Sequence, residues 1–308
     1  MSRRVLILTT AVLAAAALAC VIPGTASPTP FALPTPNLTL TAIFAPTATA
    51  PATETPVVAP ATLSIPTLTP TTLATTAPGA PTATVNPAGG RPNGTPLNAI
   101  SLAVAPAIDG DLSDWKGGSY PVAACVYGCN LRSGDADLSA QAFLGYDSTN
   151  LYVAIQVRDD KYVQITSGRN LYLGDDVEIQ LDANLAADFA TTSLSSDDYQ
   201  IGLSAGNFGT IAPNAYRWYP RAAEGSLTTV VVKGKQLADG YTLEAKIPWT
   251  VFGLTPVAGA KYGFAVSVSD DDQAGTAVQQ SMISSVGTRK LLNPTSWGTL
   301  VLAPAGGS

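Results

Sequence analysis

Proline distribution limits which part of this chain can build a folded core. Sixteen of the 24 prolines lie between Val21 and Pro96, and these 76 residues carry only two charges, Glu54 and Arg91. Proline fixes the backbone angle φ and removes a hydrogen-bond donor, so this Pro/Thr/Ala-rich segment favours extended, hydrated conformations. We therefore predict a disordered linker over residues 21–96, followed by one folded domain over residues 97–304.

The first 20 residues have the pattern of an export signal. Two arginines precede an apolar run from Val5 to Ala19, and Cys20 follows. The run Ala17-Leu18-Ala19-Cys20 resembles the lipobox of bacterial lipoproteins, in which the cysteine is lipidated and becomes the new N-terminus. We predict a lipoprotein signal peptide over residues 1–20 and anchoring at the outside of a bacterial membrane. The alternatives are an ordinary cleaved signal and a short uncleaved apolar span.

Histidine is absent from all 308 residues, which narrows the functions open to the chain. Its absence excludes Ser-His-Asp and Cys-His catalysis and removes the usual haem ligand and the commonest zinc ligand. From Leu97 onward the chain carries 13 Lys/Arg and 21 Asp/Glu. This acidic balance opposes nucleic-acid binding, because phosphate recognition needs a basic face. We expect no enzyme, no haem protein and no nucleic-acid partner.

Strand patterns dominate the predicted domain. Apolar and polar residues alternate with a period of two over residues 151–158, 177–182, 241–247 and 264–269. Turn signals rich in Asp, Asn and Gly separate these runs, and no long stretch shows helical periodicity. The pattern predicts an all-β fold, an antiparallel β-sandwich of the immunoglobulin or jelly-roll kind, with strands that bury one face and leave the other wetter.

Six short motifs occur in a fixed order across this domain. They are Ile108–Trp115, Asn150–Asp160, Gly174–Ile179, Tyr241–Trp249, Gly263–Asp272 and Asn293–Gly298. In this order the motifs resemble those of family 9 carbohydrate-binding modules. The resemblance implies an antiparallel β-sandwich, often with structural calcium, that binds the ends of polysaccharide chains without cleaving them.

The resemblance also indicates where a sugar would bind. In the sugar-binding members two tryptophans clamp the ring. Tyr172 stands at the first of these positions, and the second falls at Leu291 or Leu292. Glu178 is retained, whereas an expected arginine is replaced by Gly202. A sugar site combines aromatic platforms with polar side chains that bind the hydroxyls. The departures at three of these positions leave the ligand open.

Three further aromatic residues offer an alternative platform. Tyr216, Trp218 and Tyr219 lie close together in the sequence, near glycines and prolines that are typical of loops. We predict that they complete the carbohydrate site together with Asp176, which shares a strand face with Glu178. The alternative interpretation is a strand in which Tyr216 and Trp218 face the core.

Aspartates gather in the expected turns, at Asp109, Asp111 and Asp114, at Asp159–Asp160 and at Asp270–Asp272. Closely spaced carboxylates suit calcium, which takes six to eight oxygen ligands. We predict a structural calcium ion with Asp109, Asp111 and Asp114 as its ligands. Aspartate also favours turns for purely local reasons, so a site without metal is the alternative.

Cys125 and Cys129 lie four positions apart in a segment with tyrosine and glycine. In an oxidising compartment this spacing predicts a small disulfide loop.

These observations combine into one functional prediction. The chain is a surface lipoprotein that binds a polysaccharide or oligosaccharide without catalysis and contacts the membrane through its N-terminal lipid alone. The rival interpretation is a structural or protein-interaction β-sandwich that has lost its sugar site, to which Leu291 points.

Overall fold

The computed structural model describes residues 89–305 of the chain. The predicted signal peptide, its lipidation site Cys20 and nearly all of the linker lie outside these residues. Among residues 89–305, no helix has both the length and the apolar character needed to cross a membrane.

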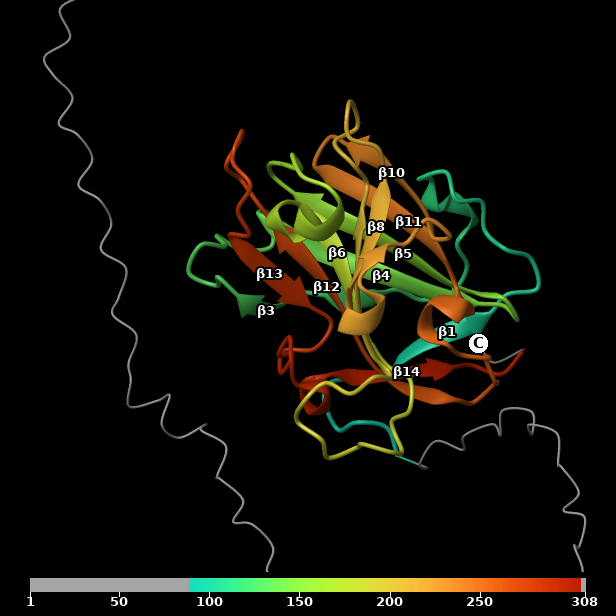
Figure 1. The fold of residues 1–308 in the computed structure, drawn as a ribbon. Helices are drawn as coiled ribbons and strands as arrows, with labels where there is room; N and C mark the ends of the chain where they lie inside the picture. Colours follow the sequence, from blue (N-terminus) through green and yellow to red (C-terminus); the bar gives the residue numbers. More distant parts are fainter. Residues whose placement is uncertain (1–88, 306–308) are drawn as a thin grey trace, which may run out of the picture. The chain divides into compact units, whose positions relative to one another are not determined.

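The described residues fold into strands joined by loops and by short 3-10 helices (Figure 1). The strands are β1 Leu97–Ser101, β2 Tyr120–Val122, β3 Ala124–Tyr127, β4 Leu138–Tyr146, β5 Asn150–Asp159, β6 Asp176–Asp182, β7 Asp198–Ser204, β8 Asn214–Tyr219, β9 Gly225–Ser226, β10 Val231–Leu237, β11 Gly240–Pro248, β12 Lys261–Asp270, β13 Ser281–Ser284 and β14 Gly298–Leu302. The helices are η2 Leu112–Asp114, η3 Gly168–Leu173, η4 Arg221–Ala223, η5 Trp249–Phe252 and η6 Pro294–Ser296.

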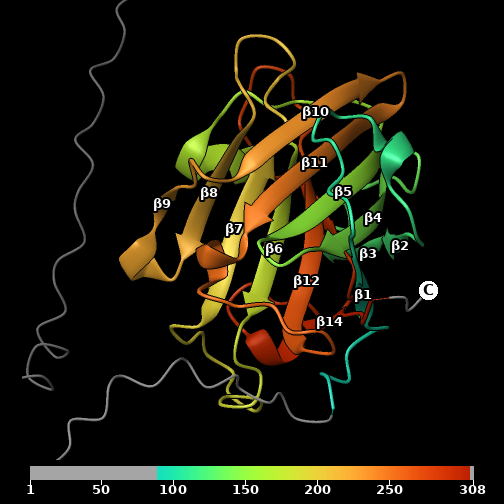
Figure 2. The same cartoon turned by 90° about the vertical axis from the view of Figure 1, so that its right-hand side faces the viewer.

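The strands form two packed layers that β1 connects. One layer has the order β9-β8-β7-β6-β12-β14, and the other has the order β10-β11-β5-β4. β1 pairs with β14 on one side and with β4 on the other. Figure 2 shows the second layer running obliquely across the first. The predicted all-β sandwich is confirmed, and its ladders are antiparallel except at β1, which is parallel to both neighbours.

The core lies between the layers, where the inward positions of the strands meet. In β5 the alternating residues Leu151, Val153, Ile155 and Val157 are at most 1% exposed. This strand pairs with β4 and β11 along its length, which places the three apolar rows side by side. Burial of these rows is the main favourable contribution to folding.

The polar face of β6 departs from the prediction of a wetter outer face. All seven residues of β6 are buried, including the outward-facing Asp176, Glu178, Gln180 and Asp182. Charged groups in such a place need partners, because removing a charge from water is costly. Two arginines from distant parts of the chain supply them, Arg289 at Glu178 and Arg91 at Asp182.

Arg91 packs on the domain, although it lies within the predicted linker of residues 21–96. Its side chain is 1% exposed, and its Nη2 lies 2.6 Å from Asp182 Oδ2. Its Nη1 donates to the carbonyl of Phe189 at 2.6 Å, and its main-chain N–H donates to Thr299 Oγ1 at 2.8 Å. The folded structure therefore includes residues ahead of β1.

Candidate functional site

A pocket of about 300 Å³ opens on the outer face of the layer that contains β6, β7 and β8. Side chains from β6, β7 and β8, from η3, and from the segment after β12 contribute to it. The lining residues are Arg169, Asn170, Tyr172, Glu178, Gln200, Trp218, Arg221, Gln279, Met282, Arg289 and Leu291. Its walls combine aromatic faces with charged and amide groups.

Aromatic residues form one wall of this pocket. Tyr172 meets Trp218 edge to face, with ring centroids 6.0 Å apart, and the ring of Tyr216, which lies outside the lining, has its centroid 5.8 Å from that of Trp218. Trp218 is 6% exposed, and its Nε1 donates to the carbonyl of Arg169 at 2.8 Å. The indole is thereby fixed to η3, the helix that carries Tyr172.

β8 turns these aromatic rings outward. Its residues Tyr216 and Trp218 lie on the same side of the layer as Glu178, whereas Ala215 between the layers joins the core. The cluster is therefore a strand, as the alternative interpretation held, but Trp218 faces the pocket and not the core. Tyr216 does not line the pocket, and its hydroxyl donates to Glu224 Oε1 at 3.1 Å. Tyr219 takes no part in the lining, and its hydroxyl donates to the carbonyl of Leu194 at 3.2 Å.

An ion pair forms the polar floor. Arg289 Nη2 lies 2.7 Å from Glu178 Oε2, and both side chains are at most 7% exposed. Gln180 and Gln200 donate to the same oxygen at 3.1 and 3.3 Å. Arg289 also donates to Gln180 Oε1 at 3.3 Å. This network holds the Glu178 carboxylate in a fixed direction at the base of the pocket.

Asp176 lies two residues before Glu178 in β6, on the same face of the strand, but it does not line the pocket. Its side chain is fully buried, and neither carboxylate oxygen has a hydrogen-bond partner among the described residues. Burial raises the pKa of Asp176 well above its usual range, and the neighbouring Glu178 charge raises it further. A neutral carboxyl group suits this position, since a buried lone charge is costly.

Comparison with known proteins identifies the fold. The family described as carbohydrate family 9 binding domain-like matches residues 108–305. The chain belongs to this family. Two solved structures of a family 9 carbohydrate-binding module from Caldicellulosiruptor kristjanssonii are similar to it, one in complex with cellotriose and one in complex with glucose.

Both of these structures are 25% identical to the chain. The cellotriose complex has a TM-score of 0.52, and the match covers 69% of this chain and 95% of that one. The glucose complex has a TM-score of 0.51, with 68% and 98% covered. No curated protein matches the chain.

The pocket of this family 9 domain departs from the expected pattern in a way that the geometry explains. Gly202 stands where the resemblance implies an arginine, and a Cβ atom there would lie 2.3 Å from the ring of Trp218 and 2.6 Å from Leu171 Cδ1. The missing side chain therefore leaves the space that Trp218 fills. Arg289 instead brings a guanidinium to Glu178.

Asp109, Asp111 and Asp114 accept local main-chain hydrogen bonds. Asp109 and Asp111 each accept from the N–H two positions ahead, at 2.8 and 3.1 Å, and Asp111 thereby caps η2. Asp114 accepts from the N–H of Ala107 at 2.8 Å. These three residues form none of the close carboxylate groups found in residues 89–305.

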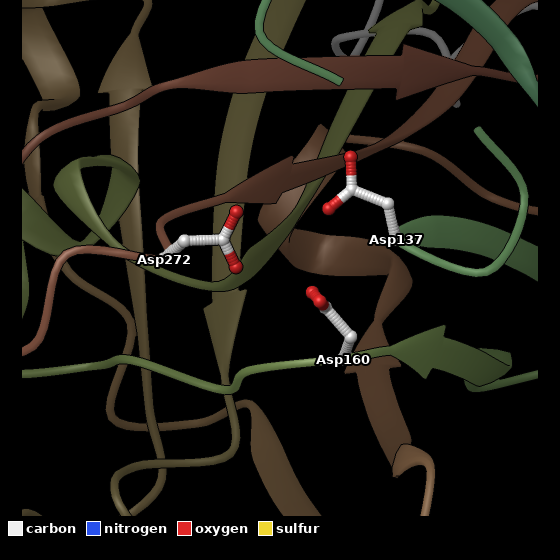
Figure 3. A group of neighbouring side chains, drawn as sticks. All are labelled: Asp137, Asp160 and Asp272. Carbon is white, nitrogen blue, oxygen red and sulfur yellow. The ribbon is translucent and has the colours of Figure 1, made fainter. Parts of the chain in front are cut away.

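Three other groups bring carboxylate oxygens within 4.8 Å of one another. They are Asp137, Asp160 and Asp272 (Figure 3), then Asp159, Asp175 and Asp270, and finally Asp182, Asp188 and Asp197. The third group already has a cation beside it, the guanidinium of Arg91 on Asp182. In the second group, burial together with the charges of neighbouring carboxylates raises the pKa of Asp159 to about 6 and that of Asp270 to about 7.

The predicted disulfide is present between Cys125 and Cys129. It closes a loop at the end of β3, the strand that pairs with β13. Gly128 within this loop has φ 59° and lies so close to the carbonyl of Gln280 that no side chain fits. The disulfide loop thus packs beside the segment that carries Gln279 and Met282 to the pocket.

Proposed function

We propose that this domain is a non-catalytic carbohydrate-binding module whose ligand occupies the pocket of Tyr172, Trp218, Glu178 and Arg289. The observation that carries this proposal is the pairing of an aromatic wall with a fixed polar floor. Aromatic faces contact the apolar face of a sugar ring, while charged and amide groups bind its hydroxyl rim. The similar family 9 structures hold cellotriose and glucose, so β-linked gluco-oligosaccharides are the first ligands to test.

The floor leaves acceptors and donors for hydroxyl groups. Three donors converge on Glu178 Oε2, so Oε1 is available to a ligand. Gln200 and Gln279 also line the pocket and present amide groups. Hydrogen bonds already hold Glu178 and Gln200 in place, so these side chains lose less conformational freedom when a ligand binds.

The same geometry supports binding without cleavage. Glycoside hydrolysis needs two carboxyl groups on either side of the scissile bond, one acting as an acid and one as a base or nucleophile. Glu178 is held by Arg289, and Asp176 is buried out of the pocket. We assign these carboxyl groups to binding and to structure.

Removal of either aromatic platform tests the proposal. We expect Trp218→Ala and Tyr172→Ala each to weaken cellotriose binding about 30-fold, the ~2 kcal/mol typical of a central contact residue. Isothermal titration calorimetry measures the affinity, with circular dichroism to verify folding. Tyr127→Ala is the matched control, because Tyr127 is 52% exposed on β3 and lies outside the pocket lining. Folded wild-type protein that binds no member of a broad glycan panel would favour the structural or protein-interaction module instead.

The proposal includes display at the cell surface by a lipid anchor. It is supported by the apolar run before Cys20 and by the Pro/Thr-rich linker, whose 76 residues would have an r.m.s. span of roughly 50 Å as a flexible coil. A structural calcium ion held by aspartates also belongs to this proposal.

Labelling tests the lipid anchor. We expect the wild-type protein to incorporate labelled fatty acid and to sediment with membranes, and Cys20→Ala to lose both properties. The matched control is Cys125→Ala, which removes a cysteine that the disulfide uses. Membrane association of Cys20→Ala without label would indicate an uncleaved apolar span.

A further inference from the structure

Arginine is concentrated at the pocket, although the domain as a whole is acidic. Of the seven arginines in residues 89–305, Arg169, Arg221 and Arg289 line the pocket, and Glu178 is the only carboxylate among the lining residues. From Leu97 onward, by contrast, the chain carries 13 Lys/Arg and 21 Asp/Glu. A cationic pocket on an acidic surface attracts an anionic ligand to one place and repels it elsewhere.

The floor of the pocket does not supply the excess positive charge. Arg289 directs its Nη2 to Glu178 and its Nε to Gln180, and its Nη1 lies 3.1 Å from Met282 Sδ. The charge of Glu178 balances the charge of this guanidinium, and both side chains are at most 7% exposed. The excess therefore comes from the two other arginines.

Arg169 and Arg221 share one carboxylate at the rim of the pocket. Arg169 lies in η3 and Arg221 begins η4, and Arg169 Nε and Arg221 Nη1 lie 3.4 and 3.0 Å from Oε1 and Oε2 of Glu224. The hydrogen bond from Arg221 lowers the pKa of Glu224, and the hydroxyl of Tyr216 also donates to Glu224. Two guanidinium groups on one ionised carboxylate leave one positive charge in excess.

Both rim arginines keep donors that no protein group uses. Their side chains are 65% and 62% exposed. Among the described residues, Arg169 pairs only through Nε and Arg221 only through Nη1, so the other guanidinium N–H groups are available to a ligand. Exposed ion pairs contribute little to stability, which leaves binding as the better explanation. A planar guanidinium donates two parallel N–H groups to a carboxylate or to a similar anion.

The second aromatic platform is missing from the pocket. Leu291, one of the two residues at the position of the second tryptophan, lines the pocket and is 41% exposed. An aliphatic side chain lacks the ring face that gives an aromatic residue its large contact with a sugar. An acidic group on the ligand, bound at the rim, would compensate for this missing contact.

We propose that the pocket selects a glycan unit that carries an acidic group, with a uronic acid as the first class of ligand, and that Arg169 and Arg221 bind this group. The inference rests on the proposed function, because the remainder of the sugar occupies the pocket of Tyr172, Trp218 and Glu178. Carboxylate and sulfate groups share the chemistry that a guanidinium recognises, so the experiment includes both.

Matched sugars test this preference in the full chain. Glucose and glucuronic acid differ only in the hydroxymethyl or carboxylate group at C5, and glucose 6-sulfate is the sulfate counterpart. By calorimetry we expect glucuronic acid to bind about tenfold more tightly than glucose. Raising sodium chloride from about 50 to about 500 mM should weaken glucuronic acid binding about threefold and leave glucose binding unchanged, because salt screens exposed charges.

Substitutions at the rim test the role of the arginines. Arg169→Gln combined with Arg221→Gln should lower the ratio of glucuronic acid to glucose affinity about tenfold, while circular dichroism verifies the fold. Glu224→Gln removes the neutralising carboxylate and should raise this ratio about threefold, which a purely structural role would not do. Arg158→Gln is the matched control and should keep the ratio, because Arg158 is exposed on β5 in the other layer, outside the pocket lining.

The outcomes separate this inference from the proposed function. Glucose that binds as tightly as both acidic sugars overturns the inference, while cellotriose binding still supports the proposed function. A preference for acidic sugars that survives Arg169→Gln with Arg221→Gln also overturns it. Tighter binding of glucose 6-sulfate than of glucuronic acid would support the arginine rim with a sulfated glycan as its ligand. Folded protein that binds neither cellotriose nor any of the three monosaccharides contradicts both proposals.

Discussion

Arg289→Met is expected to abolish carbohydrate binding and to lower the free energy of unfolding by about 3–5 kcal/mol. The change removes the partner of Glu178, whose side chain is 4% exposed and lies on the same strand face as the buried Asp176. Leaving one charge of a buried pair without its counterion costs far more than the pair itself contributes. Calorimetry with cellotriose and urea unfolding measure the two effects.

A double variant distinguishes the structural from the binding role of this pair. Glu178→Met with Arg289→Met removes both charges, and we expect most of the stability to return while binding stays lost. Lys235→Met is the control, since its pair with Asp111 is more than half exposed on both sides and should contribute about 0–1 kcal/mol. Unchanged cellotriose affinity in Arg289→Met would contradict the assigned floor.

Arg91→Met should destabilise the domain as strongly, about 3–5 kcal/mol, without changing carbohydrate affinity. Asp182 is fully buried and loses its counterion, and Phe189 loses both a donor to its carbonyl and the guanidinium 5.3 Å from its ring. For a domain of this size the melting temperature should fall by roughly 6–20 °C. Arg91 does not line the pocket, so cellotriose binding below that temperature is expected to persist.

Two shortened proteins provide the matched comparison. A protein that begins at residue 89 should melt like the full chain, whereas one that begins at residue 97 should melt like Arg91→Met. Equal melting temperatures for both would show that the contacts of Arg91 contribute nothing to stability.

Local sequence patterns predicted much of the fold. The period-two alternation in residues 151–158 located β5, because a strand between two others must bury one row of apolar side chains. The same alternation in β6 wrongly indicated that its polar row of side chains would be exposed to solvent. Its outer row is buried by Arg91 and Arg289, and no pattern within β6 indicates a partner so far away in the chain.

The candidate site was predictable only in part, because local patterns do not reveal partners that are distant in the sequence. Tyr172, Glu178 and Trp218 were selected from the sequence, and the structure brings them into one pocket. Arg289 was missed because 111 positions separate it from Glu178 and its own segment carries no recognisable motif. The one available signal was Glu178 itself, in the motif Gly174–Ile179. A carboxylate that is buried in a strand needs a cationic partner, and that partner had to come from another part of the chain.

The aspartate groups show the limit of reading turns one at a time. Asp159–Asp160 and Asp270–Asp272 stood out in the sequence as separate turns, and Asp137 and Asp175 did not. The pairing of β4 with β5 brings Asp137 to the end of β5, and the pairing of β6 with β12 brings Asp175 to the end of β12. Each close group then combines aspartates of both strand pairs, so strand register and the packing of the two layers together decided which carboxylates became neighbours.

The place of β1 determines how the domain responds to a pulling force. Its first three residues pair with β14 and its last two with β4, in both cases in parallel. Tension that enters from the N-terminal side first meets the contacts of Arg91 and then runs along β1 into both layers. The ladders of β1 are parallel and their hydrogen bonds are evenly spaced, so a pull along the strand loads them together in shear and does not open them one by one as in peeling. Such a junction transmits drag on a held ligand to the whole sandwich.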